Sequence, residues 1–574
     1  MKKIFGYLRD YKKESILGPL FKLIEAGFDL AVPLVMAKII DVGVKNGDRE
    51  YIMKMCGVLV LLAAVGLACS VTAQYYAAKA SAGFEKELKS DLFRHINTLS
   101  FTEIDSLGTS SLITRMTNDT NQLRNSVNMT LRLLLRSPFI VFGAVILAMG
   151  IDLKMSLVFL VTVLILAAVI FGIMLGTVPL YKKVQQKLDG ILLRTGENLA
   201  GVRVIRAFCK EEEEKQKFFE ESDSLAAMQK FAGKISALQS PGTFLIINLA
   251  TVALIYTGAV RVDSGHLTQG EVVALYSYMA QILVELVKLA NMIILLTKAA
   301  ACAGRISDIF AVQPSLSYPD ALSEKEDKET AVRFDNVSFT YKGSSEAAVS
   351  DISFTVKKGE TVGIIGPTGS GKSTIVNLIP RFYDAVSGNV YVNGINVKDY
   401  PKDELRLKIG IVLQRSVLFR GTLRDNIKWG APDASDSEIT AAVNAAQAAD
   451  VIKAKEGGLD CVIEQGGRDL SGGQRQRLAI ARALVRRPEI LILDDSASAL
   501  DYATDARLRK AVSELDFHPT VFIVSQRAAS VMNADKIMVL EDGKISAAGT
   551  HKELLKTSEV YSEIYNSQFK KEAV

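Results

Sequence analysis

The sequence predicts a multi-domain fold. An all-α membrane domain of six transmembrane helices with long cytoplasmic arms comes first, and an α/β domain of the P-loop type follows. Long uncharged runs are concentrated in the first 300 residues. After Val312 the pattern changes to short strand-like runs, glycine turns and charged helices, as in an α/β domain. Within that second part, residues 366–373 read Gly-Pro-Thr-Gly-Ser-Gly-Lys-Ser, which is a glycine-rich turn between a strand and a helix.

Bulk composition excludes several classes of protein. The 574 residues are too many for one ordinary domain, and 49% hydrophobic with 23% charged residues rules out a disordered chain or a collagen. The five cysteines lie far apart without a C-x-x-C motif, which argues against a zinc or redox pair and fits a reducing compartment. The net charge of +5 implies no strong field for nucleic acid, so we expect no nucleic-acid partner.

Three uncharged runs of 24, 27 and 26 residues, at 55–78, 155–181 and 235–260, are each long enough to cross a bilayer, since a helix needs about 20 residues to do so. A shorter run at 137–151 can be extended through 131–135 past Arg136. Two further candidates carry charges inside the span. The predicted spans are approximately 16–41, 52–79, 131–151, 155–181, 239–261 and 271–297.

Loop charges predict the orientation. The segments 1–13, 80–130 and 182–240 hold 5, 5 and 11 Lys and Arg residues, whereas the alternate loops hold one or two. Because basic loops stay inside, we expect a multi-pass protein of the plasma (inner) membrane, with its N-terminus and its C-terminal domain in the cytoplasm. The first apolar stretch is interrupted by charge, so no cleavable signal peptide is expected.

The two long basic loops have helical composition, and a 25-residue helical extension would reach about 38 Å beyond the membrane. They are either solvated helical hairpins or arms that carry the membrane helices to the C-terminal domain, and we favour arms. Residues 108–111 and 211–214 mark the tips or their flanks. We expect a membrane domain at 1–312, a proline-containing linker at 313–330 and the α/β domain at 331–574.

The glycine-rich turn matches G-x-x-x-x-G-K-[ST] and has an apolar strand before it and a helix pattern after it. In such a turn, backbone N–H groups point inward around phosphate oxygens, a lysine contacts the β- and γ-phosphates, and a serine hydroxyl binds Mg²⁺. Asp494 ends a buried strand 128 residues after Gly366, where P-loop ATPases hold Mg²⁺. The predicted cofactors are ATP and Mg²⁺, bound by Gly366, Pro367, Thr368, Gly369, Ser370, Gly371, Lys372, Ser373, Thr374 and Asp494.

A second glycine motif precedes this strand. Ser471, Gly472, Gly473 and Gln474 follow Leu470, and this motif can present N–H and hydroxyl groups to an anion at a helix start. Taken alone, the motif is better interpreted as a helix N-cap with a flexible turn. Its meaning therefore depends on the rest of the domain.

With these motifs in this order, the whole chain resembles ATP-binding cassette (ABC) transporters, and more narrowly exporter-type half-transporters, in which a membrane domain precedes one P-loop ATPase domain. The resemblance implies that Tyr341 stacks on adenine and that Gln414 contacts Mg²⁺ and senses the arms. It further implies that Ser471, Gly473 and Gln474 grip the γ-phosphate of ATP held by the opposite subunit, and that 498–501, ending in Asp501, links the two sites. Short coupling helices at the arm tips would dock on the cassettes.

Two positions depart from the family pattern. Asp495 stands where the family has a catalytic glutamate, and Gln526 stands where it has a switch histidine. Aspartate is one methylene shorter, and glutamine cannot take up a proton as histidine can. The departures are either harmless drift or the mark of a site that binds MgATP and hydrolyses it slowly. We favour the second reading, and with it a heterodimer in which the intact signature completes the active site of a homologous half-transporter.

The predicted function is ATP-driven export of small amphipathic or hydrophobic compounds across the plasma membrane by alternating access. Alternatives are a lipid or peptide translocase driven by the same ATPase domains, or a nucleotide-gated regulatory or channel subunit. Charged residues inside two spans either meet the small-molecule substrate in a polar cavity or form internal ion pairs. These residues are Lys22, Glu25 and Asp29 in the first span and Glu285 and Lys288 in the sixth.

Overall fold

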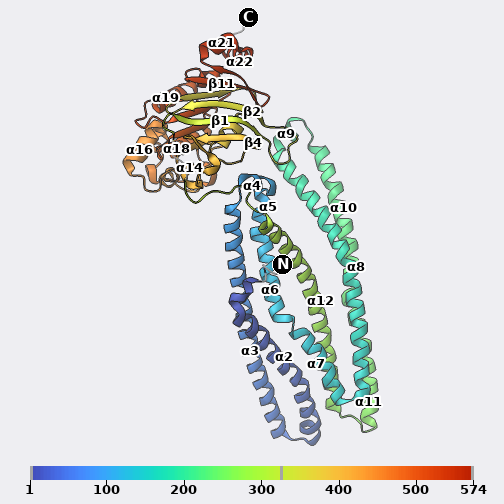
Figure 1. The fold of residues 1–574 in the computed structure, drawn as a ribbon. Coiled ribbons are helices and arrows are strands. Elements are labelled where there is room, and N and C mark those ends of the chain that lie inside the picture. Colours follow the sequence, from blue (N-terminus) through green and yellow to red (C-terminus); the bar gives the residue numbers. More distant parts are fainter. Residues whose placement is uncertain (1–3, 5, 323–326, 570–574) are drawn as a thin grey trace. The chain divides into compact units, whose positions relative to one another are not determined.

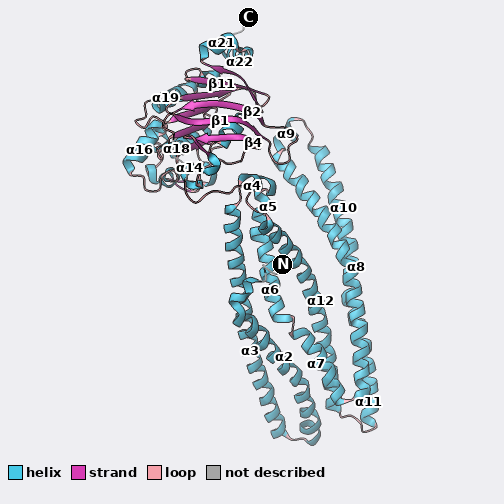
Figure 2. Cartoon of the chain, in the orientation of Figure 1, coloured by secondary structure: helices cyan, strands magenta, loops and turns pink. Residues whose placement is uncertain are grey.

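The computed structural model describes residues 4, 6–322 and 327–569 and divides into two compact units. A helical unit contains the chain up to Asn97 together with Ser110–Val312. A sheet unit contains Thr98–Thr109 and the chain from Gln313 onward. Figure 1 traces both units along the chain, and Figure 2 separates the helices of the first from the strands of the second.

The helical unit is built from long helices joined by short turns. A 3₁₀ turn at Tyr7–Tyr11 precedes the first long helix, and π-helical turns occupy Ile39–Val44 and Arg115–Asp119. The helices are α2 (Lys12–Lys38), α3 (Arg49–Thr98), α5 (Thr109–Thr114), α6 (Thr120–Leu133), α7 (Arg136–Ile151), α8 (Leu153–Ala200), α9 (Val202–Ala207), α10 (Glu211–Ala237), α11 (Gln239–Asp263) and α12 (Gln269–Ala311).

Within the described residues, five helical segments are long and apolar enough to cross a membrane: Arg49–Thr98, Thr109–Ile151, Leu153–Ala200, Glu211–Asp263 and Gln269–Ala311. The predicted span at 16–41 corresponds to α2, which is not among them because it carries Lys22, Glu25 and Asp29. Six spans were predicted, so the span at 16–41 remains a proposal.

The predicted span at 131–151 lies in the helical segment Thr109–Ile151, which has a break in its hydrogen-bonding pattern at Leu134 and Leu135, although both residues keep helical dihedrals. Helix α6 ends at Leu133 and α7 begins at Arg136. Pro138 explains the break, because it has no N–H to donate to the carbonyl of Leu134 and its ring would clash with that carbonyl in a continuous helix. The break lies directly before Arg136.

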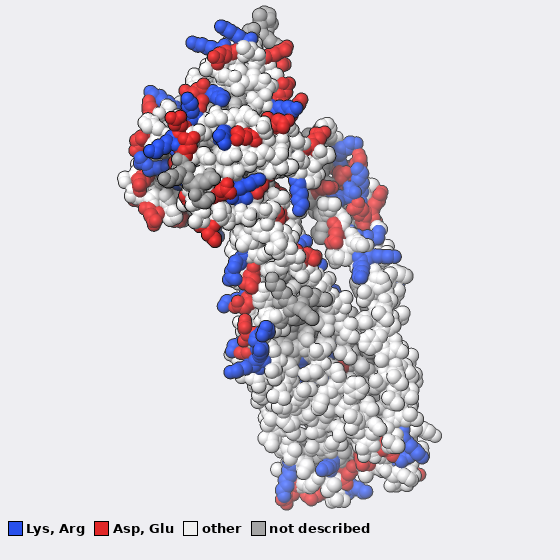
Figure 3. Space-filling model, in the orientation of Figure 1, with Lys and Arg blue, Asp and Glu red and all other residues white. Residues whose placement is uncertain are grey.

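Helices α3 and α8, with 50 and 48 residues, are more than twice as long as a bilayer crossing requires. Figure 3 shows an uncharged band on the visible face of the helical unit, between charged loops at one end and charged arm segments at the other. Only 6% of the apolar window of α3 is buried within the chain, so this helix must be covered by lipid or by another protein.

Close helix packing in this unit depends on small residues and a few hydrogen bonds. The buried Tyr278 hydroxyl donates to the Leu30 carbonyl at 2.7 Å, which joins α12 to α2. A Cβ atom at Gly270 would lie 2.3 Å from the Ala37 carbonyl oxygen, so only glycine allows this approach. Small residues at such contacts are typical of membrane helices.

The sheet unit contains two larger sheets and a two-stranded pair. An antiparallel sheet has the order β2-β1-β4-β5, and a six-stranded sheet has the order β12-β11-β3-β10-β9-β6, parallel except for β12. The strands are β1 (Thr330–Phe339), β2 (Val349–Lys357), β3 (Thr361–Ile365), β4 (Ser387–Val392), β5 (Ile395–Asn396), β6 (Ile409–Val412), β7 (Gly421–Thr422), β8 (Val462–Ile463), β9 (Ile490–Asp494), β10 (Thr520–Val524), β11 (Lys536–Glu541) and β12 (Lys544–Gly549).

Helices cover these sheets and close two hydrophobic cores, one on each side of the parallel strands. The parallel strands are almost fully buried, as expected for strands covered on both faces. The helices are α13 (Lys372–Leu378), α14 (Lys402–Leu407), α15 (Leu423–Lys428), α16 (Asp436–Ala445), α17 (Ala449–Lys453), α18 (Gly472–Leu484), α19 (Tyr502–Ser513), α20 (Ala528–Val531), α21 (His551–Thr557) and α22 (Glu559–Phe569), with short 3₁₀ turns at Val397–Asp399, Gly458–Asp460 and Gln465–Gly467.

One short helix from the first arm, α4 (Phe101–Leu107), packs in the sheet unit. The Phe101 ring lies 4.7 Å from the ring of Phe382, and the Tyr383 hydroxyl donates to Asp105 at 2.8 Å. Burial raises the pKa of Tyr383, and the Asp105 carboxylate raises it further. Gly108, with φ of 74°, ends the helix inside the segment 108–111, which stays a predicted arm tip.

Asp152 stabilises the turn between α7 and α8, and substituting it tests this role. Its carboxylate accepts hydrogen bonds from Lys154 N and Met155 N at 2.9 Å and pairs with Arg261. Asp152→Ala should lower the stability of the purified protein by about 1–3 kcal/mol, because the N-cap and the ion pair are both lost. Asp152→Asn, which keeps the cap, should be intermediate.

Thermal unfolding in detergent measures both variants, with the exposed Asp263→Ala as the matched control that should change little. An Asp152→Ala protein as stable as Asp152→Asn would contradict this role for the cap.

Candidate functional site: a phosphate-binding turn and two carboxylates

The glycine-rich turn between β3 and α13 has no room for a side chain at two of its glycines. Gly366 and Gly371 have φ of 158° and 91°. A Cβ atom would lie 2.2 Å from the Leu540 carbonyl oxygen at Gly366, and 2.5 Å from that of Ala348 at Gly371. The motif spacing therefore reflects steric need, and the turn leaves its N–H groups at the start of α13, where an anion is stabilised.

Lys372 and Ser373 begin α13 and face the ends of the parallel strands. The Lys372 ammonium donates to the carbonyls of Gly366 and Pro367 at 2.9 and 2.6 Å, within the turn itself. Burial lowers the pKa of Lys372, and the charges of Asp495 and Asp494 oppose that shift. Its side chain is thus held inside the turn as a point charge for a phosphate.

Asp494 ends β9, where it is 4% exposed and accepts a hydrogen bond from the Ser373 hydroxyl at 3.0 Å. Burial raises its pKa above the ordinary aspartate value, and the Asp495 charge adds to this, while the Ser373 hydrogen bond and the Lys372 charge lower it. A cation at this position would relieve the cost of the buried negative charge.

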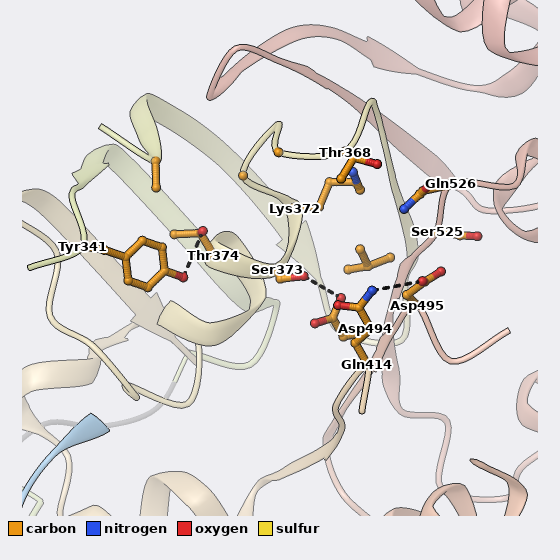
Figure 4. A pocket seen from close by; sticks show the side chains of 14 residues that line it. Tyr341, Thr368, Lys372, Ser373, Thr374, Gln414, Asp494, Asp495, Ser525 and Gln526 are labelled. Atoms are coloured by element: carbon orange, nitrogen blue, oxygen red, sulfur yellow. Dashed lines mark hydrogen bonds between the residues drawn. The ribbon is translucent and has the colours of Figure 1, made fainter. Parts of the chain in front are cut away.

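Asp495, Gln414 and Gln526 complete one wall of a cavity of about 300 Å³ (Figure 4). The Gln414 amide donates to the Asp495 carboxylate at 3.4 Å. Asp495 has a positive φ of 46°, and Gln526 follows β10 on the neighbouring strand. The cavity is lined by Tyr341, Ala348, Thr368, Gly369, Gly371, Lys372, Ser373, Thr374, Gln414, Asp494, Asp495, Val524, Ser525 and Gln526.

Strand register explains why these residues meet. Val524 of β10 pairs with Ile364 of β3 on one side and with Asp494 of β9 on the other. The carboxyl ends of three parallel strands therefore form one edge, which is where open α/β sheets bind ligands.

Tyr341 lies at the opposite end of the cavity from the carboxylates (Figure 4). Its hydroxyl lies 3.2 Å from that of Thr374, and its ring packs edge-on against Phe339 and Tyr383. The two neighbouring rings fix the orientation of Tyr341, so an aromatic surface is available to stack on a base.

The glycine motif at 471–474 stands apart from this cavity. Ser471 is the N-cap of α18, and its hydroxyl accepts from Gln474 N at 3.3 Å while the Gln474 side chain accepts from Ser471 N at 2.9 Å. Ser471 and Gly472 are exposed, and a Cβ atom at Gly473 would lie 2.9 Å from the Ala499 carbonyl oxygen. The N-cap interpretation is therefore correct for local structure, and it leaves this helix start open to solvent.

Asp501 lies outside the cavity as well and caps α19 by accepting from Thr504 N at 2.9 Å. Arg527 was missed by sequence reasoning. Its guanidinium donates to the carbonyls of Ala497, Ser498 and Leu500 at 3.1–3.2 Å. This residue joins the loop after β9 to the loop after β10, and no local pattern could reveal it because all three acceptors are backbone atoms.

A second missed residue is Gln568 in α22. Its amide accepts from Ala528 N and donates to Gln526 O, both at 2.8 Å. The helix is anchored through Tyr561, which is fully buried and contacts His551 Nδ1 through its hydroxyl at 2.8 Å. The C-terminal helix therefore holds the backbone on both sides of Arg527.

The arrangement fits a nucleotide whose phosphates lie at the glycine-rich turn. Residues 15–286 match the family described as ABC transporter transmembrane region, and residues 349–498 match the family described as ABC transporter. The chain belongs to the ABC transporter family. It has a helical membrane domain followed by one ATPase domain, and it is an ABC-type transport ATPase.

Similar proteins cover almost the whole chain. An ABC transporter ATP-binding protein of Mycobacterium tuberculosis is 38% identical over 98% of this chain and 97% of its own length. An ATP-dependent lipid A-core flippase of Haemophilus ducreyi is 29% identical over 99% of this chain and 98% of its own. The solved structure of a bacterial Atm1-family ABC exporter with ATP bound has a TM-score of 0.81 at 24% identity, covering 98% and 99% of the two chains, which shows the same fold.

The donor set fits MgATP. Mg²⁺ usually takes one or two carboxylates, waters and the phosphates of the nucleotide, and Asp494, Ser373 and Gln414 lie on the same cavity wall. Among the described residues no group of three or more His, Cys, Asp or Glu side chains could hold a metal ion alone. The turn and Lys372 would bind the phosphates.

Lys372→Ala tests the phosphate site. Hydrogen bonds to charged groups contribute about 1.5–3 kcal/mol, so MgATP affinity should fall by about tenfold or more. Isothermal titration of the purified protein measures this affinity, and the exposed Lys552→Ala should leave it unchanged. Equal affinity in Lys372→Ala would contradict the assignment.

Proposed function

We propose that this chain is one half of a heterodimeric exporter that moves small amphipathic or hydrophobic compounds across the plasma membrane. Its own P-loop site binds MgATP but hydrolyses it slowly. The motif at 471–474 completes the competent site of a homologous half-transporter. We keep the partition into a membrane domain at 1–312, a linker at 313–330 and a cassette at 331–574 as part of this proposal, together with six transmembrane helices and cytoplasmic cassettes.

The main observation behind the proposal is that two residues that differ from the family pattern line the same cavity. Asp495 and Gln526 both line the cavity that holds Lys372 and Ser373. An aspartate reaches about one methylene less far than a glutamate, and a misplacement of about 1 Å can cost about 10²-fold in rate. Gln526 can orient a group by hydrogen bonding but cannot accept a proton from it.

The exposed signature supports the other half of the proposal. Ser471 and Gly472 face solvent and lie outside their own chain's cavity. Ser471, Gly473 and Gln474, at the N-terminus of the 13-residue α18, would present hydroxyl and N–H groups to the γ-phosphate of the companion's ATP. Asp501 would lie between the two sites.

In this mechanism, binding of ATP closes the two cassettes, and the arms transmit the closure so that the membrane cavity opens outward. Hydrolysis at the competent site resets the cycle. Helix α4 supports the coupling step, because its contacts with Phe382 and Tyr383 lie in the sheet unit, shortly after α13.

A lipid is one specific alternative to a small amphipathic compound as the transported substrate. The similar Haemophilus ducreyi protein is described as a lipid A-core flippase, so a lipid translocase with the same engine is a second candidate. An amphipathic cargo is compatible with either version.

Restoring both departures tests the slow site. Asp495→Glu combined with Gln526→His should raise phosphate release by the chain purified alone by at least tenfold, because base and switch residue then reach the attacking water. The exposed Asp433→Glu should change nothing. Brisk turnover by the unmodified chain alone would overturn the heterodimer proposal.

Substituting Ser471 tests the shared site. Ser471→Ala removes both the γ-phosphate contact and the N-cap, whereas Ser471→Asp keeps a cap acceptor but directs a negative charge at the phosphate. Both should slow ATP hydrolysis by the complex at least tenfold, and only the alanine variant should lose about 1 kcal/mol of stability.

Phosphate release and thermal unfolding of the complex with its companion separate these effects. The exposed Ser387→Ala is the matched control. Hydrolysis by Ser471→Asp at the unmodified rate would contradict the shared-site scheme.

A further inference from the structure

Six charged side chains meet inside the membrane domain, and we call them the charge network. Arg136 is at its centre, donating to Glu285 at 2.7 Å and to Asp29 at 2.8 Å, with Glu25 at 4.0 Å. Lys288 donates to Glu285 at 2.8 Å, and Lys22 donates to Glu25 at 2.6 Å. The network consists of Lys22, Glu25, Asp29, Arg136, Glu285 and Lys288, so it holds three cations and three anions.

The network lies within apolar stretches of its helices. Seven uncharged residues, 15–21, precede Lys22 in α2, and nine, 289–297, follow Lys288 in α12. Arg136 is 15 residues from the far end of α7, or about 22 Å along the helix axis, in a bilayer core of about 30 Å. This leaves about 8 Å to the nearer face of the core. The Arg136 and Glu285 side chains are only 12% and 4% exposed, so they pair inside the protein instead of snorkelling to that face.

The interruption by Pro138 lies at the same place. Leu134 and Leu135 keep right-handed helical dihedrals, but Pro138 has no N–H to donate to the Leu134 carbonyl. The Ser137 hydroxyl, in the first turn of α7, donates to Glu285 at 2.7 Å. A carbonyl without its helical donor at membrane depth needs another polar partner or a cavity, and neighbouring side chains or water usually supply it. This observation is independent of the charges.

Glu285 has its hydrogen-bonding capacity filled, but Asp29 and Lys288 at the two ends of the network do not. Both Glu285 oxygens accept hydrogen bonds, from Arg136 and Lys288 on one and from Ser137 on the other. Asp29 has a side chain 43% exposed, and within the described residues its Oδ1 has no partner. Lys288 is 40% exposed and uses one of its three N–H donors.

The unused hydrogen-bonding atoms at the two ends belong to groups of opposite charge, the Asp29 carboxylate and the Lys288 ammonium. A ligand with only one charge would satisfy one end and leave the other charge unpaired at membrane depth, which is costly. A head group with an ammonium and an anionic group satisfies both. Leu134, Leu135 and Phe139 are 44%, 51% and 44% exposed beside the break and offer apolar surface to a hydrocarbon chain.

We propose that the charge network is the head-group site for a zwitterionic amphiphile, with Asp29 binding its ammonium and Lys288 its phosphate or carboxylate. This inference rests on the proposed function and names the class of its cargo. Arg136 and Glu285 are positioning residues that hold the two binding groups, and the buried Arg136 Nε has no partner among the described residues.

The experiment measures equilibrium binding to the full chain in nanodiscs of uncharged glycolipid, with protein-free discs subtracted. The radiolabelled probes share one alkyl chain and are dodecyl phosphoethanolamine, dodecyl phosphate and dodecylammonium. Asp29→Asn should weaken the zwitterion and dodecylammonium about tenfold and spare dodecyl phosphate. Lys288→Gln should weaken the zwitterion and dodecyl phosphate by a similar factor and spare dodecylammonium.

Lys298→Gln, an exposed lysine on the same helix, is the matched control and should bind all three probes as the unmodified chain does. Competition by phosphatidylethanolamine added to the disc would support the site with a bilayer lipid as its source, and lack of competition would support it with a smaller amphiphile. Loss of all three probes in both variants, or unchanged binding with weakened assembly of the complex, would overturn the proposal.

Binding needs neither hydrolysis nor the companion chain, so its failure is distinct from failure of the proposed function. If the probes bind as expected while the unmodified chain alone turns over ATP briskly, the head-group site stands and the heterodimer scheme does not.

Discussion

The hydrogen bond between Ser373 and Asp494 is the interaction on which the nucleotide site depends. It joins the first turn of α13 to the end of β9, with Asp494 4% exposed and its pKa raised by burial. Lys372 is buried beside it with a lowered pKa. The site thus keeps a cation and an anion close together without pairing them directly, so both remain available to a metal–phosphate ligand.

Much of this architecture could be predicted from sequence because it is encoded locally. The glycines of the P-loop, the strand ending in Asp494 and the uncharged runs follow from sterics, strand burial and bilayer thickness. The cavity brings Asp495, Gln526 and Gln414 together with the P-loop, as their motif order suggested. The two residues that depart from the family pattern therefore belong to one site.

The remainder could not be predicted because it depends on contacts between distant residues. The run through Arg136 was predicted as one span and lies in one helical segment, but the interruption at Pro138 was not anticipated, and the charges near it were left undecided between ion pairs and a cavity. Helix α4 contacts Phe382 and Tyr383, which in sequence resemble ordinary core residues. Arg527 binds only backbone carbonyls, so its partners leave no trace in residue identity.

Helix α22 has a practical consequence for anyone handling this protein. Gln568 lies in the last described turn of this helix and bonds to the backbone at Gln526 and Ala528. A deletion or an affinity tag that disturbs this last turn would release the loop that carries Gln526 into the nucleotide cavity. Expression designs should therefore place fusions at the opposite terminus and treat the final helix as part of the ATPase.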